Sequence, residues 1–167
     1  MDVGEAIQAR RSIRAYEKKR VPDNTMQELL DSMRLAPSAN NRQSWNIIVV
    51  TDDELKKKLV PVCGNQRFVG ECSAFLVGVT EPNAYYSTVD MTIALDHLTL
   101  RAVELGLGTC WIGDFEADKV KEILSVPTDR EVPICMTLGY PTQSPGARKR
   151  KSLSSLFHKD RWDWPWG

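Results

Sequence analysis

The segment from about Ser87 to Leu105 constrains the fold most strongly, because it predicts a long helix with two apolar faces. Gly106 follows it, as glycine often does at a helix C-terminus. One apolar stripe holds Met91, Leu95, Leu98, Ala102 and Leu105, and the other holds Val89, Ile93, Leu100, Val103 and Leu107. A helix that is apolar on more than one face is buried on more than one face. It is therefore either a central core helix or a core helix that also forms a subunit interface.

The composition is that of one ordinary globular domain. The chain has 167 residues, of which 42% are hydrophobic and 26% charged. It has 22 Lys+Arg and 22 Asp+Glu, and this balance disfavours a dedicated nucleic-acid binder. No apolar run is long enough to span a bilayer, and the opening "MDVGEAIQARR" lacks the apolar region of a secretory signal. We therefore expect a cytoplasmic protein with no membrane or nucleic-acid partner.

The cysteines and histidines do not follow the spacing of a metal site. There is no C-x-x-C pair, and the residues concerned are Cys63, Cys72, Cys110, Cys135, His97 and His158. We predict no metal, and we expect the cysteines to be small apolar residues in a reducing compartment. His97 falls in the long helix and is expected to be a hydrogen-bonded core residue. No side chain stands out as a general acid or nucleophile, so no catalytic residue is assigned.

The rest of the chain alternates between helical and strand patterns. Helices are expected at 2–10, 24–36, 52–60, 87–105 and 116–126, and strands at 46–50, 74–79, 108–113 and 133–140. Thr25 and Glu28 have the spacing of a capping box for the second helix. The tail contains three of the five tryptophans, so we expect it to pack on the body or on a second subunit.

Two basic clusters stand far apart in the sequence. The first is Arg10, Arg11 and Arg14 around Ser12, and the second runs from Arg148 through Arg150 to Lys151. Guanidinium groups form forked, charge-assisted hydrogen bonds with phosphate oxygens, so the clusters could share an anion. Alternatively, the first is an exposed basic helix end and the second is a solvated charge run.

Two further stretches have a functional and a structural interpretation. "APSANNRQSW" (36–45) is a loop that offers many neutral donors and acceptors, either to a flat heterocycle or to its own turns. "GLGTCWIG" (106–113) is not a dinucleotide-binding glycine motif, and no phosphate-binding P-loop motif is present. It is either a plain strand entry or a backbone edge on which a planar ring can lie at Gly113.

These stretches together resemble the nitroreductase family of FMN-dependent oxidoreductases. "RRSIRAY" resembles the family's R-R-S-x-R-x-F/Y, and "APSANNRQSW" resembles A-P-S-x-x-N-x-Q-P-W, with Ser44 in place of the usual proline. "GLGTCWIG" resembles G-L-G-x-x-W-x-G, and "LGYP" with its basic loop resembles the C-terminal elements. The match covers nearly the whole chain and keeps the family's order. The chain is shorter than many members between Val60 and Ala74, which suggests a more open site.

The resemblance implies an α+β three-layer sandwich with a central, mostly antiparallel sheet, and an intertwined homodimer with FMN at the interface. It implies one domain over 1–167, with 141–167 as an arm that packs on the partner subunit. It also implies the FMN-binding residues. From one subunit these are Arg10, Arg11, Ser12, Arg14, Trp111, Ile112, Gly113, Arg148 and Arg150; from the partner they are Ser38, Asn41 and Gln43; and either Asn65 or Gln66 touches the ring.

The expected activity is a ping-pong cycle, in which NAD(P)H delivers hydride to flavin N5 and a small electron-poor acceptor, a nitroaromatic or quinone, is then reduced. Other reductive reactions on the same FMN, such as dehalogenation or flavin fragmentation, are alternatives, because a fold does not fix a function. A non-catalytic flavin-binding module and a nucleic-acid-associated protein are rivals from other classes.

Overall fold

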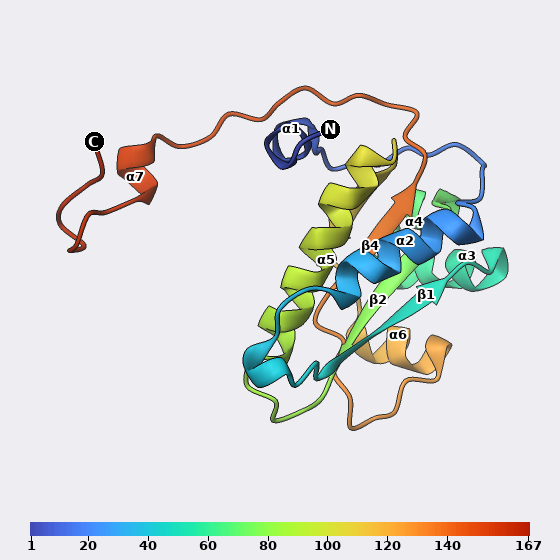
Figure 1. Ribbon diagram of the computed structural model, residues 1–167. Coiled ribbons are helices and arrows are strands. Elements are labelled where there is room, and N and C mark those ends of the chain that lie inside the picture. The colour runs from blue at the N-terminus through green and yellow to red at the C-terminus, as the bar shows by residue number, and fades with distance from the viewer.

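The computed structural model describes residues 1–167 and has three layers, with helices on both faces of a four-stranded sheet (Figure 1). The strands are β1 (Trp45–Val50), β2 (Ala74–Thr80), β3 (Gly108–Ile112) and β4 (Cys135–Gly139). Their order is β1-β2-β4-β3, and every neighbouring pair is antiparallel. The predicted α+β sandwich with an antiparallel sheet is therefore confirmed.

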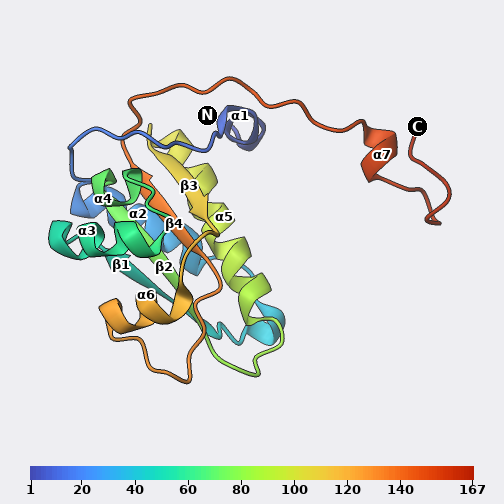
Figure 2. The same cartoon turned by 180° about the vertical axis from the view of Figure 1, so that it is seen from behind.

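Eight helical segments surround the sheet. They are α1 (Val3–Ala9), α2 (Asp23–Arg34), the 3₁₀ turn η1 (Ala39–Asn41), α3 (Asp53–Val62), α4 (Phe68–Glu71), α5 (Ser87–Glu104), α6 (Ala117–Leu124) and α7 (Leu153–Leu156). Figure 1 shows α2 and α5 on one face, and Figure 2 shows α3, α4 and α6 on the other. No helix is both long enough and apolar enough to cross a membrane.

The sheet divides the core into two apolar clusters because successive side chains of a strand point to opposite faces. In β2, Phe75 and Val77 join the cluster under α3, α4 and α6, whereas Ala74 and Leu76 join the cluster under α2 and α5. Every residue of β2 is buried, which explains why its sequence is apolar up to the final Thr80.

The long helix forms as predicted and ends before Gly106, which has a positive φ of 72°. Its first stripe lies in the core, where Met91, Leu95, Leu98 and Ala102 are each no more than 1% exposed. The second stripe is only partly covered, and Val89 is 54% exposed. A single chain therefore leaves one apolar face of α5 open to solvent.

The capping box predicted for the second helix is wrong. α2 begins at Asp23 with Pro22 at the N-cap position, so Thr25 and Glu28 already lie inside the helix. Glu28 instead forms an ion pair of 2.7 Å with Arg101 of α5. A long-range contact thus uses the side chain that local spacing had assigned to a cap.

The cysteines are small buried residues as predicted, and His97 is hydrogen-bonded as predicted but only half-buried. All four cysteines are free and buried. The His97 ring is half-buried, with Nδ1 3.3 Å from the Ser32 carbonyl oxygen. The cysteines pack in the core, and His97 forms a hydrogen bond with the backbone of α2.

The C-terminal segment does not pack on its own body. Figures 1 and 2 show it running past α1 and then away, so that α7 lies apart from the three layers. Phe157, Trp162, Trp164 and Trp166 are all at least 50% exposed. Packing of the tail on its own body is therefore not observed, and packing on a second subunit stays a prediction.

Candidate functional site

Both basic segments of the chain line one pocket of about 900 Å³. The pocket lies between the segment that follows α1 and the extended segment that follows β4. Its lining residues are Ile7, Gln8, Arg10, Arg11, Ser12, Arg14, Gln143, Pro145, Gly146, Ala147, Arg148 and Arg150. The structure therefore gathers at one place the five arginines and the serine that the sequence analysis singled out. We call this the arginine pocket.

The N-terminal wall of the arginine pocket is fixed against the edge of the sheet. The Ile13 N–H donates to the Thr109 carbonyl at 2.9 Å, and the Ile13 side chain is buried. In an extended segment the neighbours of a buried residue point the other way, so Ser12 and Arg14 face outward. The hydroxyl of buried Tyr16 donates to the Ile13 carbonyl at 2.8 Å. This network holds the backbone that carries Arg14.

The C-terminal wall is held by Gln143, a residue that the sequence analysis missed. With its amide oxygen facing the backbone, Gln143 accepts from the N–H groups of Ala15 at 3.2 Å and Arg14 at 2.5 Å. Beside it, the Thr142 N–H donates to the Ala15 carbonyl at 3.1 Å. The segment after β4 is thus paired with the N-terminal segment just before it reaches Arg148. A lone glutamine in a loop gives no sequence signal for this role.

The arginine pocket is strongly positive because none of its five arginines forms an ion pair with a carboxylate. Arg11 donates to the Gln8 and Arg10 carbonyls at 2.6 and 2.7 Å, and its buried Nε has no partner. Burial raises the pKa of the adjacent Cys110 thiol, and the charges of Arg14 and Arg10 act in the opposite direction. Clustered guanidinium groups without counter-charges repel one another, so an anion would stabilise them.

The other end of β3 carries the second predicted element, Trp111, Ile112 and Gly113. Ile112 is 1% exposed, so it can offer only its backbone to a ligand, and Trp111 is half-buried. Gly113 is exposed, and nothing lies within 4 Å of the position that a Cβ would take. Gly113 lies four residue steps beyond Thr109 along extended chain, which is about 13 Å. The arginine pocket and this bare backbone thus lie at the two ends of one strand.

Gln66, which with Asn65 was expected to touch the ring, lies near the residue that follows Gly113. Its Nε2 donates to the Cys63 carbonyl at 3.0 Å and more weakly to the Asp114 carbonyl at 3.5 Å. Asp114 was not predicted, although it directly follows the glycine motif. Its Oδ2 would be 2.4 Å from a Cβ on Gly64, so a carboxylate is packed against this turn.

The polar loop with Ser38, Asn41 and Gln43 does not reach the arginine pocket of its own chain. Gln43 donates its N–H to Ser38 Oγ at 3.2 Å and its Nε2 to Asn41 Oδ1 at 3.1 Å. The Ala39 N–H donates to the carboxylate of Asp90, near the start of α5. Figure 1 shows α1 near the other end of this helix, about 27 Å away for 18 residues. One chain therefore separates the two halves of the predicted site.

The chain therefore has a three-layer α+β fold with a positively charged pocket at the edge strand of its sheet. The model of the family described as "Nitroreductase family" matches residues 7–82 and 68–140. The chain belongs to the nitroreductase family, as its motifs suggested.

Individual relatives agree with this assignment. A "Putative NADH dehydrogenase/NAD(P)H nitroreductase" of Methanothermobacter thermautotrophicus is 31% identical over 96% of this chain and 85% of its own. Among solved structures, the NADPH:FMN oxidoreductase from Vibrio harveyi complexed with NAD⁺ has a TM-score of 0.90 at 27% identity, covering 96% of this chain and 78% of its own. A nitroreductase family protein from Clostridium novyi NT has a TM-score of 0.82 at 28% identity, and the match covers 99% of this chain and 97% of that chain.

Proposed function

We propose that this protein is an FMN-dependent oxidoreductase that takes reducing equivalents from NAD(P)H and passes them to a small electron-poor acceptor. The arginine pocket is the observation that carries the proposal. Relatives named NADPH-flavin oxidoreductase in Vibrio harveyi and FMN reductase (NADPH) in Bacillus subtilis, at 28% and 26% identity, support the cofactor and the reductant.

The residues present fit FMN. The phosphate matches a pocket with five unpaired guanidinium groups and the Ser12 hydroxyl, in which Arg11 Nε is buried without an acceptor. The ring matches the other end of β3, where the backbone at Gly113 carries no side chain and its surroundings are open. A separation of about 13 Å between these elements suits a ligand with a flat head and a charged tail.

When bound, FMN would supply the hydride chemistry, in two half-reactions in which the reductant and the acceptor use the same face of the flavin ring in turn. The chain's own residues would bind and orient the cofactor. Arg10, Arg14 and the arginines of the C-terminal segment hold the anionic tail, and the rigid strand β3 sets the distance to Gly113. The backbone at Gly113 has open space beside it, which would let a flat acceptor stack there, so we propose nitroaromatics and quinones as substrates.

We further propose that the active unit is a homodimer. Val89 of α5 is exposed, and α1, which contacts α5, also exposes Val3 and Ile7. A second copy would cover these side chains, and its loop with Ser38, Asn41 and Gln43 would complete the site that one chain leaves divided. The arm 141–167 would then bury its exposed aromatic side chains on the partner subunit.

Spectroscopy of the purified protein tests the function. We expect a flavin spectrum that is bleached by NADH or NADPH without oxygen and restored by menadione or nitrofurazone. A flavin-loaded protein that neither nicotinamide bleaches is a binding module and not the reductase proposed.

Substitutions in the arginine pocket test the site. Arg14→Ala and Arg150→Ala each remove charge-assisted hydrogen bonds worth about 1.5–3 kcal/mol apiece, so the FMN Kd should rise roughly 10- to 100-fold. Lys149→Ala is the matched control, because it also removes one positive charge but does not line the pocket. Equal FMN affinity in all three variants would contradict the assignment.

Truncation after Lys151 tests the arm. Light scattering and FMN titration of the full-length and shortened chains should show weaker dimerisation and weaker FMN binding after truncation. A shortened chain that remains a tight dimer with unchanged FMN affinity would refute the role of the arm, and it would leave the assignment of the arginine pocket untouched.

A further inference from the structure

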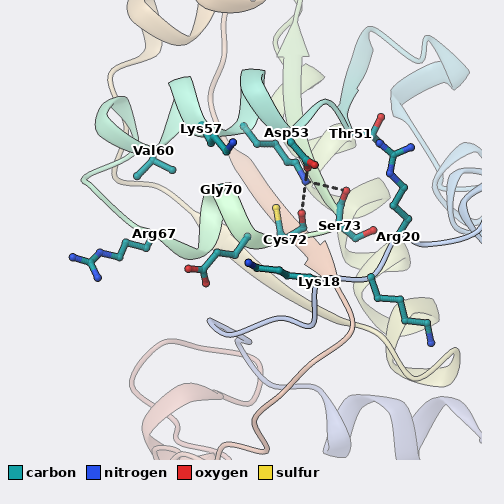
Figure 3. Close-up of a pocket in the computed structure, with 13 residues that line it drawn as sticks. Lys18, Arg20, Thr51, Asp53, Lys57, Val60, Arg67, Gly70, Cys72 and Ser73 are labelled. Carbon is teal, nitrogen blue, oxygen red and sulfur yellow. Dashed lines mark hydrogen bonds and ion pairs between the residues drawn. The ribbon is translucent and has the colours of Figure 1, made fainter.

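A second basic cavity lies apart from the arginine pocket, and it shares no lining residue with it. Its volume is about 620 Å³, within the usual range for small-molecule sites. It lies between the segment 18–20, helices α3 and α4, and the entry to β2 (Figure 3). The lining residues are Lys18, Lys19, Arg20, Thr51, Asp53, Lys56, Lys57, Val60, Arg67, Gly70, Glu71, Cys72 and Ser73. We call it the lysine pocket.

Positive charge dominates the lysine pocket, which has six cationic and two acidic side chains. Lys57 pairs with Glu54, which lies outside the lining. Lys18, Arg20 and Arg67 form no ion pair at all. Figure 3 shows Arg20 beside Thr51 and Lys18 near Cys72 and Ser73, whereas Arg67 extends away from the other labelled side chains. The whole chain is neutral, so this excess is local.

A buried ammonium group forms the floor of the lysine pocket. The Lys56 side chain is only 4% exposed, and its Nζ donates to the Cys72 carbonyl at 2.5 Å and pairs with Asp53 Oδ1 at 3.0 Å. The hydrogen bond and the charge of Lys56, followed by the charge of Arg20, hold the pKa of Asp53 below its usual value. Asp53 is therefore ionised at neutral pH and is paired with Lys56, so it does not neutralise Lys18 or Arg67, and Glu71 is the one other acidic residue in the lining.

The lining also indicates which anion fits. Only two of the thirteen lining residues are hydrophobic and none is aromatic, so there is no surface on which a purine or flavin ring could stack. Arginine and lysine together suit phosphate oxygens, arginine as a fork and lysine as a compact charge. We propose that the lysine pocket is a second anion site, which binds the diphosphate group of a small molecule between the segment 18–20 and α3.

Such an anion would bridge two segments of the chain that are far apart in sequence. Lys18 and Arg20 belong to the segment that leaves the arginine pocket, and Lys57 belongs to α3, which leads directly to Gln66 and the turn beside Gly113. Bound diphosphate would tie these two segments together. The site is separate from the proposed FMN site, so its test does not depend on flavin turnover.

The test measures binding of sodium diphosphate to the protein with saturating FMN, by calorimetry and by the shift in Tm at constant ionic strength. We expect saturable binding that the double variant Lys18→Gln/Arg20→Gln weakens at least tenfold, with the FMN Kd unchanged within about twofold. The control Lys58→Gln/Lys119→Gln removes the same charge from helix positions outside both pockets and should bind diphosphate like the native chain.

Three results would overturn the proposal. One is the absence of binding to the native chain at about 10 mM diphosphate, where even a weak site would shift Tm. Another is an equal loss in the control variant, which would indicate a general charge effect. The third is loss of binding in Arg148→Gln but not in Lys18→Gln/Arg20→Gln, which would place the anion in the arginine pocket.

Comparison with ADP tests whether the lysine pocket contacts only the diphosphate group of a ligand or also its nucleoside. We expect ADP to bind within about threefold of diphosphate, since the lining offers the base no partner. ADP that binds more than tenfold tighter would contradict the assignment of a site for the diphosphate group alone.

Discussion

The substitution Gly108→Ala tests whether the edge of the sheet positions the arginine pocket. Gly108 begins β3 and lies directly beneath Ile13, the buried residue between Ser12 and Arg14. A Cβ at position 108 would be 2.4 Å from Ile13 Cγ1 and 2.9 Å from Ile13 Cβ. Carbon atoms in contact are normally about 3.5–4.0 Å apart, so the segment with Ile13 would have to move by about 1 Å.

The expected effect has a clear sign because two contributions oppose each other. Replacing glycine by alanine within a strand by itself stabilises a protein by about 0.5–1 kcal/mol. Overpacking a well-filled site costs about 1–3 kcal/mol, and the 2.9 Å hydrogen bond between Ile13 and Thr109 would also lengthen. We expect a net loss of about 1–2 kcal/mol in the free energy of unfolding and, because Arg14 moves with Ile13, about a tenfold rise in the FMN Kd.

Urea unfolding of the apo protein and fluorescence titration with FMN measure the two effects. Gly146→Ala is the control, since a Cβ there meets nothing within 4 Å although the residue lines the same pocket. The double variant Gly108→Ala/Ile13→Ala lacks the Ile13 Cγ atoms that clash. Its loss in free energy of unfolding should therefore be at least about 1 kcal/mol smaller than the sum of the losses in the two single variants. If Gly108→Ala is as stable as Gly146→Ala and binds FMN normally, the proposed support of the pocket is wrong.

Three other predictions follow from the buried polar groups. Tyr16→Phe removes the hydroxyl that bonds the Ile13 carbonyl and Thr137 Oγ1, and urea unfolding should show a loss of about 1–3 kcal/mol. Burial raises the pKa of the Cys63 and Cys72 thiols to about 12, so these thiols in the native protein should not react with Ellman's reagent at neutral pH. Thiols in the unfolded chain lose their protons at lower pH, so the free energy of unfolding should fall as the pH rises from about 9 toward 12. Lys56→Met leaves the Cys72 carbonyl without its donor, at a cost of about 1–3 kcal/mol, and an NMR titration should show the pKa of Asp53 returning toward its ordinary value.

The elements of the fold could be predicted because their hydrophobic periodicity is strong. The strand at β2 and the helix at α5 lie within a residue or two of the expected positions, since each buries a continuous set of apolar side chains. Local spacing failed at α2, where Glu28 pairs with Arg101 and does not cap. The strand order β1-β2-β4-β3 was also beyond reach, because it places β4 between two strands that precede it in the chain.

The site was predictable where several like charges stand together and unpredictable where one polar residue acts alone. Arg14 and Arg150 were identified from two dense clusters, and the structure does bring both to one pocket. Gln143 and Asp114 were missed, because the role of each depends on backbone groups that only the folded chain places beside it. The lysine pocket was not predicted for a related reason, since its cations come from two short runs at 18–20 and 56–57 and from Arg67, and only the folded chain brings these together.

The placement of the site also explains the second apolar face of α5, from which the sequence analysis began. The arginine pocket lies near one end of this helix and the polar loop with Asn41 near the other, so no motion of a single chain short of unfolding could join them. A two-fold axis crossing α5 would place the loop of each copy beside the pocket of the other. Such an axis needs an apolar helix face at the surface, and Val89 and its neighbours provide one. On this reasoning, the exposed stripe and the divided site have one cause, and a charge at position 89 should weaken dimerisation and FMN binding together.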